Sequence, residues 1–311
     1  MVWQRKHILD IESLSKEEIS HILKTAKPMK EVLLRPIKKL PTLRGKSVMH
    51  LFYEASTRTR TSFETAGKVL GADTASIAVA QSSISKGESL LDTAKTIEAM
   101  RVDLVVIRHA ASGAAAFLAE HLQAGIINAG DGQHEHPTQA LLDMYTMQEE
   151  LGDLAGKKVV IVGDILHSRV ARSNAWGLTK MGAEVTLVGP PTLLPPELKS
   201  LGVKLSYNLD AELPGADVVM ALRLQLERQQ SGLFPSLREY SQAYGLSSQR
   251  IEKTGIKTMV LHPGPMNRGV EISSELANSQ QAKIEEQVTN GVAVRMALIY
   301  LLVGGTSNVV A

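Results

Sequence analysis

Residues 56–63 of the chain read Ser56-Thr57-Arg58-Thr59-Arg60-Thr61-Ser62-Phe63. An apolar run at residues 48–52 precedes this stretch and is typical of a buried strand, while apolar side chains recur at helical spacing over residues 63–70. A helix start presents free backbone N–H groups and positive dipole potential, so hydroxyl and guanidinium groups placed there favour phosphate binding. We therefore predict a phosphate site at a strand-to-helix junction, where an α/β sheet binds its ligands.

The two arginines of this stretch are expected to have different roles. Arg58 and Arg60 lie two residues apart, and residues with this spacing point to different faces of a helix. We expect one of them to reach the phosphate and the other to be structural, and the pattern leaves open which is which. A merely capped, solvated helix start is the alternative, but a cap needs one hydroxyl and does not explain the run of them.

Length and composition bound the class of protein. At 311 residues the chain exceeds what one hydrophobic core usually serves, so we expect two domains. The net charge is +2, and basic and acidic residues are mixed along the chain, which argues against nucleic acid or an anionic membrane as a partner. The lack of cysteine excludes disulfides, thiolate metal sites and a cysteine nucleophile. Residues 1–12 do not resemble a signal peptide and the apolar run 296–303 is too short to span a bilayer, so a soluble cytoplasmic protein is expected.

Apolar runs alternate with helical stretches along the whole chain, as in parallel strands joined by right-handed crossovers. The predicted strands form two similar sets, namely residues 48–52, 74–79, 104–107 and 126–129, then residues 159–162, 185–188, 218–222 and 258–261. A helix over residues 138–151 is predicted to bridge the two sets, and the apolar stretch 282–303 to be a buried helix. The expected fold is α/β, with two doubly wound domains, each a mostly parallel sheet flanked by helices.

Ligands of an open α/β sheet bind beyond the carboxyl ends of its strands, and polar residues follow several predicted strands here. They are Ser56 to Thr59, Arg108, residues 130–139, residues 167–169, Arg223 with Gln225, and residues 262–265. We expect Ser56, Thr57 and one arginine to bind a phosphate, with Arg108 completing its charge neutralisation. Thr59, Arg108 and His136 are suited to hold a carbonyl oxygen that acquires negative charge.

Three further features of these loops are open to more than one interpretation. His134 and His136 have the chemistry of metal ligands, but no His-Glu-x-x-His spacing occurs, so we predict no metal. Thr138 is predicted to cap the helix that follows it. The loop over residues 81–89 is either simply solvated or brings the charge of Lys86 to an anionic ligand.

In the second half of the chain, Arg169, Arg223 and Gln225 follow predicted strands. Because the guanidinium fork matches a carboxylate with two hydrogen bonds, these residues suit a ligand with more than one carboxylate. Either arginine alone would more often be a surface or salt-bridge residue.

Three motifs occur in order and over the whole chain: Ser56-Thr57-Arg58-Thr59-Arg60, His136-Pro137-Thr138-Gln139 and His262-Pro263-Gly264-Pro265. Together they resemble the aspartate/ornithine carbamoyltransferase family, and residues 52–60, 86–88 and 163–169 are similar to its aspartate-specific members. The resemblance implies transfer of a carbamoyl group from carbamoyl phosphate to the α-amino group of L-aspartate, giving N-carbamoyl-L-aspartate and phosphate. It implies no cofactor and a place at the committed step of pyrimidine synthesis.

The resemblance also implies site residues. Those for carbamoyl phosphate are Ser56, Thr57, Arg58, Thr59, Ser82, Lys86, Arg108, His136 and Gln139, of which Arg58, Thr59, Lys86, Arg108 and His136 are implied to be catalytic. Those for aspartate are Lys86, Arg169, Arg223, Gln225, Gly264 and Pro265. The Gly264-Pro265 bond is expected to be cis.

Domain boundaries and partners follow from the same resemblance. It implies a carbamoyl phosphate-binding domain at residues 1–150, to which a helix at residues 287–311 returns, and an aspartate-binding domain at residues 151–286. In the family, the residues that match Ser82 and Lys86 enter the site of a neighbouring subunit, which implies a homotrimer. A regulatory chain or a dihydroorotase is a further possible partner.

Three other functions fit parts of the sequence. Ornithine-specific members share the phosphate side, but their Ser-Met-Gly segment is missing here and Pro263-Gly264-Pro265 stands in place of their Cys-Leu-Pro. A nucleotide-dependent dehydrogenase needs the Gly-x-Gly-x-x-Gly turn, which residues 162–166 lack. A catalytically silent anion-binding scaffold is distinguished from an enzyme by an assay alone.

Overall fold

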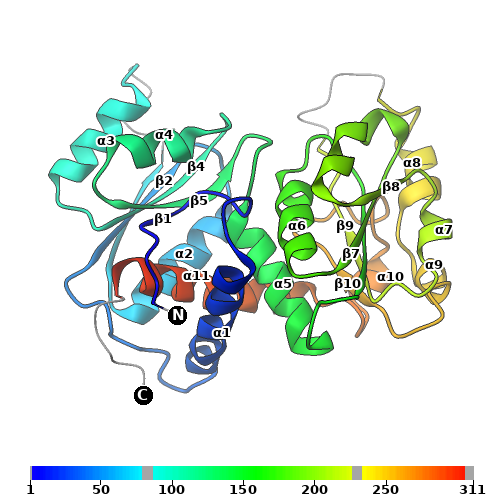
Figure 1. Ribbon diagram of the computed structural model, residues 1–311, viewed down its shortest axis with the longest axis horizontal. Coiled ribbons are helices and arrows are strands. Elements are labelled where there is room, and N and C mark those ends of the chain that lie inside the picture. Colours follow the sequence, from blue (N-terminus) through cyan, green and yellow to red (C-terminus); the bar gives the residue numbers. More distant parts are fainter. Residues whose placement is uncertain (1, 79–86, 226–232, 305–311) are drawn as a thin grey trace. The chain divides into compact units, whose positions relative to one another are not determined.

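The computed structural model describes residues 2–78, 87–225 and 233–304. The chain divides into two compact units, one formed by Met1–Leu142 with Val288–Ala311 and the other by Asp143–Gln287. Each unit contains a five-stranded sheet in which the paired strands are all parallel (Figure 1). The predicted α/β class with two doubly wound parallel sheets is therefore confirmed.

The first unit is built on the sheet with strand order β1-β5-β4-β2-β3. Its strands are β1 (His7–Ile8), β2 (Ser47–Phe52), β3 (Asp73–Ala78), β4 (Leu104–His109) and β5 (Gly125–Asp131). Parallel neighbours need a crossover connection, and helix α2 (Thr57–Leu70) joins β2 to β3 while α4 (Ala114–His121) joins β4 to β5. The remaining helices of this part of the chain are α1 (Lys16–Leu33) and α3 (Leu90–Ala99).

Both faces of the first sheet are covered, as the apolar runs of its strands require. Met49 and Leu51 of β2 pack in one cluster with residues of α3 and α4, such as Ile97 and Leu118. Alternate residues point the other way, and the ring of His50 lies 6.3 Å from that of Phe63 in α2, measured between centroids. Figure 1 shows α3 and α4 on one side of the sheet and α2 on the other.

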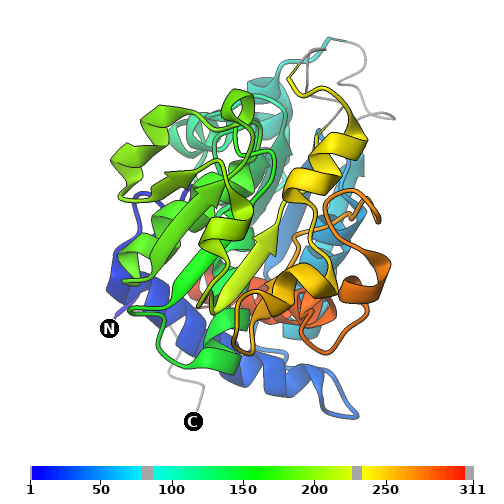
Figure 2. The ribbon, with the colours of Figure 1, turned by 90° about the vertical axis from the view of Figure 1, so that its right-hand side faces the viewer.

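The second unit is built on the sheet with strand order β10-β9-β6-β7-β8 (Figure 2). Its strands are β6 (Lys158–Val162), β7 (Glu184–Val188), β8 (Lys204–Ser206), β9 (Val218–Ala221) and β10 (Met259–Leu261). Its helices include α6 (Arg169–Lys180), α7 (Leu209–Glu212), α8 (Leu237–Tyr244), α9 (Ser248–Glu252) and α10 (Ser274–Ala277). Val160, Val219 and Val260 from three neighbouring strands form its buried centre.

The boundaries between the two units fall within two long helices of the sequence. These helices are α5 (Pro137–Leu151) and α11 (Ile284–Val303), and the boundary falls after Leu142 in the first and after Gln287 in the second. In α11 the apolar residues Val294, Met296 and Ile299 are fully buried, which confirms the predicted buried helix. Its apolar composition on most sides is what a helix packed all round requires.

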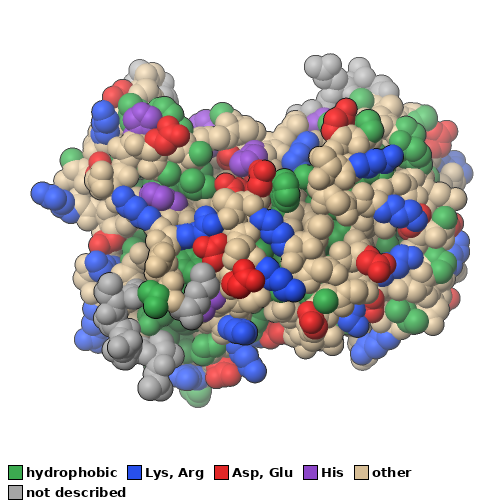
Figure 3. Space-filling model, in the orientation of Figure 1, with side chains coloured by type: hydrophobic (Ala, Val, Ile, Leu, Met, Phe, Trp, Pro, Cys, Tyr) green, Lys and Arg blue, Asp and Glu red, His purple; other side chains and the backbone are tan. Residues whose placement is uncertain are grey.

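The eight predicted strands are all present, with bounds that differ by one or two residues. The short strands β1 and β8 and the helix α1 were not among the predicted elements. In the described part of the chain, no helix is both long enough and apolar enough to cross a membrane. On the face shown in Figure 3, Lys and Arg side chains are interspersed with Asp and Glu.

Candidate active site

The start of α2 in the first unit has features that suit anion binding. Ser56 is the N-cap residue with extended backbone (φ −160°, ψ 96°), yet its side chain makes no capping hydrogen bond. The first turn contains no acidic residue, and the side chains of Thr57 and Arg58 are exposed. The backbone N–H groups of this turn and the hydroxyls beside them are therefore arranged as a phosphate cradle requires.

The two arginines of this stretch differ in their surroundings. The Nε atom of Arg60 lies 3.8 Å from Oε1 of Glu64, one helical turn further on. Glu64 also accepts a hydrogen bond of 2.5 Å from the Ser76 hydroxyl of β3. Arg60 thus has a structural partner along the helix. Arg58 is exposed in the first turn, beside the N–H groups of the helix start, and this position makes it the candidate for the phosphate.

Arg108 lies within strand β4 rather than after it, because the strand extends two residues beyond the predicted end at residue 107. It pairs in register with Phe52 of β2, so it stands level with the end of the strand that leads to α2. Its Nη2 donates to Oε1 of Glu54 over 2.5 Å, and its Nη1 donates to the Ala129 carbonyl over 3.3 Å. A carboxylate therefore orients this guanidinium at the carboxyl edge of the sheet.

The prediction that Thr138 caps α5 is wrong. The helix begins at Pro137, and the His136 carbonyl accepts from the N–H groups of Gln139 (2.9 Å) and Ala140 (3.3 Å), so His136 is the capping residue. Proline suits the first helical position because its missing N–H has no partner there in any helix. The Thr138 hydroxyl is buried and has no hydrogen-bond partner among the described residues. His136 and Gln139 are both buried at this helix start.

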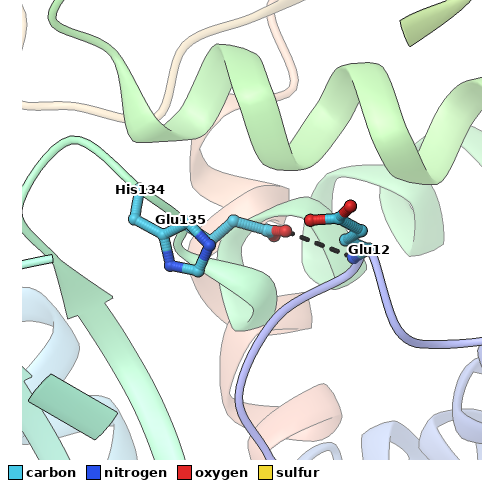
Figure 4. A group of neighbouring side chains, drawn as sticks. All are labelled: Glu12, His134 and Glu135. Carbon is cyan, nitrogen blue, oxygen red and sulfur yellow. Dashed lines mark hydrogen bonds between the residues drawn. The ribbon is translucent and has the colours of Figure 1, made fainter. Parts of the chain in front are cut away.

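Glu12, His134 and Glu135 form a group whose ligand atoms lie within 4.8 Å of one another (Figure 4). Glu135 and His134 form hydrogen bonds with neighbouring residues. Glu135 accepts from the backbone N–H groups of Ile11 (2.8 Å) and Glu12 (3.2 Å). Nδ1 of His134 lies 3.1 Å from Oδ2 of Asp131, and this hydrogen bond raises the pKa of His134. Hydrogen bonding thus accounts for the group, and the predicted absence of a metal stays a prediction.

In the second unit, the buried carboxylate of Asp164 organises the loop after β6. Its Oδ1 lies 2.8 Å from Nδ1 of His167, and its Oδ2 accepts from the backbone N–H of Gln225 over 3.3 Å. The side-chain amide of Gln225 donates to the His167 carbonyl over 2.9 Å. Asp164 thus connects the loops after β6 and β9. The sequence did not indicate this role, although Asp164 lies within the stretch 163–169 that is similar to the aspartate-specific members.

Arg169 and Arg223 lie on these same two loops. Arg169 is the first residue of α6 and is buried, and Ser168 caps the helix by accepting from the Ala171 N–H over 3.1 Å. Arg223 is half-buried next to the end of β9. Arg172 was not singled out in the sequence, although its Nη2 donates to the Leu166 carbonyl over 3.0 Å and burial lowers its pKa against the opposing effect of Asp164. The structure therefore places several guanidinium groups around one connected pair of loops.

The loop after β10 contains the cis Gly264-Pro265 bond, as predicted. Gly264 has φ 65°, in the region that glycine adopts most readily. Its N–H donates to Nδ1 of His262 over 2.8 Å, so the proton of the neutral ring is on Nε2, which faces Oε1 of Glu271 at 3.3 Å. Both side chains are almost fully buried, and Glu271 also accepts from the Asn267 N–H. Glu271 is a second loop-ordering carboxylate that the sequence did not reveal.

Ser82 and Lys86 lie outside the described residues, as does most of the loop over residues 81–89. The remaining predicted site residues fall into two groups. The first unit brings Ser56, Thr57, Arg58, Thr59, Arg108, His136 and Gln139 to the carboxyl ends of β2, β4 and β5. The second unit brings Arg169, Arg223, Gln225, Gly264 and Pro265 to the carboxyl ends of β6, β9 and β10.

Two family models match the chain, one over each half. Residues 6–149 match the carbamoyl-P binding domain of aspartate/ornithine carbamoyltransferase, and residues 155–302 match its Asp/Orn binding domain. The aspartate carbamoyltransferase catalytic subunit of Desulfitobacterium hafniense (strain DSM 10664 / DCB-2) is 71% identical over 311 residues, which are 100% of both chains.

Solved structures are similar over nearly the whole chain. Aspartate transcarbamoylase from Trypanosoma cruzi in complex with carbamoyl phosphate and aspartate has a TM-score of 0.87 at 29% identity, covering 97% of this chain and 98% of that chain. Ornithine carbamoyltransferase from Pyrococcus furiosus has a TM-score of 0.87 at 26% identity, covering 99% and 100%. The chain belongs to the aspartate/ornithine carbamoyltransferase family.

Proposed function

We propose that this chain transfers the carbamoyl group of carbamoyl phosphate to the α-amino group of L-aspartate, giving N-carbamoyl-L-aspartate and phosphate, the committed step of pyrimidine synthesis. The observation that carries the proposal is the full-length identity of 71% with an aspartate carbamoyltransferase catalytic subunit. The open start of α2, where the Ser56 hydroxyl makes no capping bond, supports it independently, since a bound phosphate would use those donors.

The chemistry needs positioning and fixed positive charge rather than a reactive side chain. The aspartate amine attacks the carbamoyl carbon, and the tetrahedral species that forms carries negative charge on its oxygen and on the phosphate. We assign Thr59, Arg108 and His136 to that oxygen and Ser56, Thr57 and Arg58 to the phosphate. The carbon–oxygen bond to phosphate then breaks, and the departing phosphate takes the amine proton.

The second substrate is assigned from the charge of the second unit. Arg169 and Arg223 match a ligand with two carboxylates, whereas the cationic tail of ornithine would meet like charge there. We retain Gln225, Gly264 and Pro265 as further aspartate contacts. The Gln225 amide that already donates to the His167 carbonyl keeps its oxygen available to accept from the substrate ammonium or amine.

We also retain the domain boundaries and the assembly that the resemblance implies. Residues 1–150 with 287–311 would bind carbamoyl phosphate and residues 151–286 would bind aspartate. Ser82 and Lys86 would complete the site of a neighbouring subunit in a homotrimer, with Lys86 touching both substrates. A regulatory chain or a dihydroorotase would be an additional partner of that trimer, and native mass of the active protein reports the assembly.

The test is an assay of the purified chain with carbamoyl phosphate and, in parallel, L-aspartate or L-ornithine, followed by detection of the ureido group. We expect N-carbamoyl-L-aspartate to form and its rate to exceed that with ornithine by at least about a thousandfold, because a site built for a carboxylate leaves its arginines unpaired with the wrong substrate. A silent scaffold would give no ureido product, and an ornithine-specific enzyme would give the reverse order; either result contradicts the proposal.

A further inference from the structure

A buried carboxylate in the second unit connects its own helix with two others, and no step of the proposed reaction uses it. Asp143, in α5, is fully buried, as is Asn174 in α6, and Gln287 in α11 is 3% exposed. Nδ2 of Asn174 donates to Oδ2 of Asp143 over 2.8 Å, and Nε2 of Gln287 donates to Oδ1 over 2.7 Å. Both amides thus turn their NH2 groups toward Asp143, whose two oxygens accept.

The fixed orientation of the Gln287 amide has a consequence for the loop after β10. Its oxygen points away from Asp143 and accepts from the backbone N–H of His262 over 3.0 Å. The His262 ring accepts from the Gly264 N–H and contacts Glu271, which accepts from the Asn267 N–H. A continuous set of hydrogen bonds thus runs from Asp143 to the loop that contains Gly264.

The second arm reaches the helix that starts with Arg169. Asn174 lies in the second turn of α6, where its Nδ2 also donates to the Val170 carbonyl over 3.1 Å. The two donors of one amide therefore fix the rotation of α6 relative to Asp143. Both elements that are tied to this carboxylate, α6 and the 262–267 loop, carry residues assigned above to aspartate.

We propose that Asp143 is a positioning residue for the second substrate, which orders α6 and the 262–267 loop through the amides of Asn174 and Gln287. This inference depends on the proposed function, since it concerns the same aspartate site. An amide that turns around in such a buried network changes the hydrogen bonds at both of its ends, so reversing one partner also disturbs the residues next to it. By this proposal Asp143 acts through Asn174 and Gln287 rather than by touching the substrate.

The first test is D143N, which keeps the shape and replaces one acceptor oxygen by a donor. One of the two amides must then face a donor or turn around, and a turned Gln287 loses its bond to the His262 N–H. We expect KM for aspartate to rise about tenfold, as for the loss of one buried hydrogen bond, with KM for carbamoyl phosphate within about twofold of wild type. E150Q is the matched control, because Glu150 is an exposed carboxylate of the same helix that pairs with Lys283 at 3.0 Å.

The second test is the double variant D143N/Q287E, which exchanges the carboxylate and the amide. The introduced amide donates to the introduced carboxylate and accepts from Asn174, while the carboxylate still accepts from the His262 N–H, so the three hydrogen bonds described above are kept. We expect KM for aspartate to return to within about threefold of wild type. This variant also decides the matter if D143N alone does not fold.

The outcomes separate the two proposals. A wild-type chain without carbamoyltransferase activity contradicts the proposed function. If the wild type is active, three results would overturn the positioning role of Asp143. They are an unchanged KM for aspartate in D143N, equal changes in KM for both substrates in D143N, and a KM for aspartate that does not recover in the double variant.

Discussion

In the first unit the proposed phosphate ligands Ser56, Thr57, Arg58 and Thr59 are consecutive residues at one helix start, whereas in the second unit the proposed aspartate ligands come from three separate loops. The helix start supplies N–H donors and a dipole from backbone geometry alone, so a short local sequence suffices there. The three loops have no such common backbone, and buried carboxylates such as Asp164 and Asp143 connect them instead. A phosphate site can therefore be local, while a site for a dicarboxylate amine depends on tertiary hydrogen bonds.

The largest effect on kcat should come from replacing Arg58 and Arg60 one at a time. We expect R58A to lower kcat about a thousandfold, as for loss of a preorganised group that stabilises transition-state charge. R60A should change kcat by less than about threefold, because Arg60 forms a partly exposed pair with Glu64 along the helix. The measurement is kcat at saturating concentrations of both substrates.

If kcat fell equally in R58A and R60A, or if R58A kept the kcat of the wild type, the first turn of α2 would not be the phosphate site proposed above. Thermal unfolding of both variants serves as the control for folding.

The second prediction compares how the two units respond to acid. His50 is fully buried in β2, and burial lowers its pKa from 6.5 to about 4. Between these values the unfolded chain binds a proton that the folded chain does not, so stability is lost as the pH falls from 6.5 toward 4. The loss from this residue should reach about 3 kcal/mol, and H50Q should remove that part of the pH dependence.

The chain offers a reporter for each unit in this experiment, since Trp3 lies in the first and Trp176 in the second. The background variant is W176F, which retains Trp3 as its only tryptophan. Urea unfolding of this variant is followed by fluorescence at pH 7 and pH 4.5. The measurement is repeated with H50Q added and, as a control at an exposed histidine, with H121Q added. If H50Q leaves the pH dependence at Trp3 unchanged, His50 is not the acid-sensitive group of the first unit.

The smallest effect concerns the two capping serines, one in each unit. Ser168 accepts a hydrogen bond from the Ala171 N–H and caps α6, so S168A should lower the free energy of unfolding by about 1 kcal/mol. Ser56 makes no capping bond, so S56A should change it by less than about 0.5 kcal/mol while raising KM for carbamoyl phosphate. Urea titration and steady-state kinetics measure both quantities; a larger stability loss in S56A than in S168A would reverse the contrast.

Much of the fold could be predicted from apolar periodicity, and the failures have physical causes. The strands β1 and β8 are two and three residues long, which is too short for a period to be visible. The helix α1 contains Pro28, but it also begins with a capping box in which Ser15 accepts from the Glu18 N–H, a signal that could have revealed it. Thr138 was assigned as a cap because its residue type suits one, although proline at the first position moves the helix start one residue earlier.

The proposed site was predictable to different degrees in the two units. Hydroxyls and arginines at a strand-to-helix junction form a recognisable pattern, so the α2 residues could be named from sequence. Asp143 and Glu271 lie outside the quoted motifs, and Asp164 lies within the stretch 163–169, but nothing in the sequence indicated their partners, which lie up to 144 residues away in the chain. Their roles became visible when distant loops were brought together.

The sequence by itself determined the alternation of strands and helices and the family, and it predicted the phosphate cradle at the start of α2, because each depends on short-range periodicity or on contiguous motifs. The tertiary structure decided that Arg60 pairs with Glu64, where α5 begins and how the loops that carry Arg169, Gln225 and Gly264 are held. The reason is that a buried carboxylate acquires its role from donors that folding brings to it, and no local pattern specifies those donors.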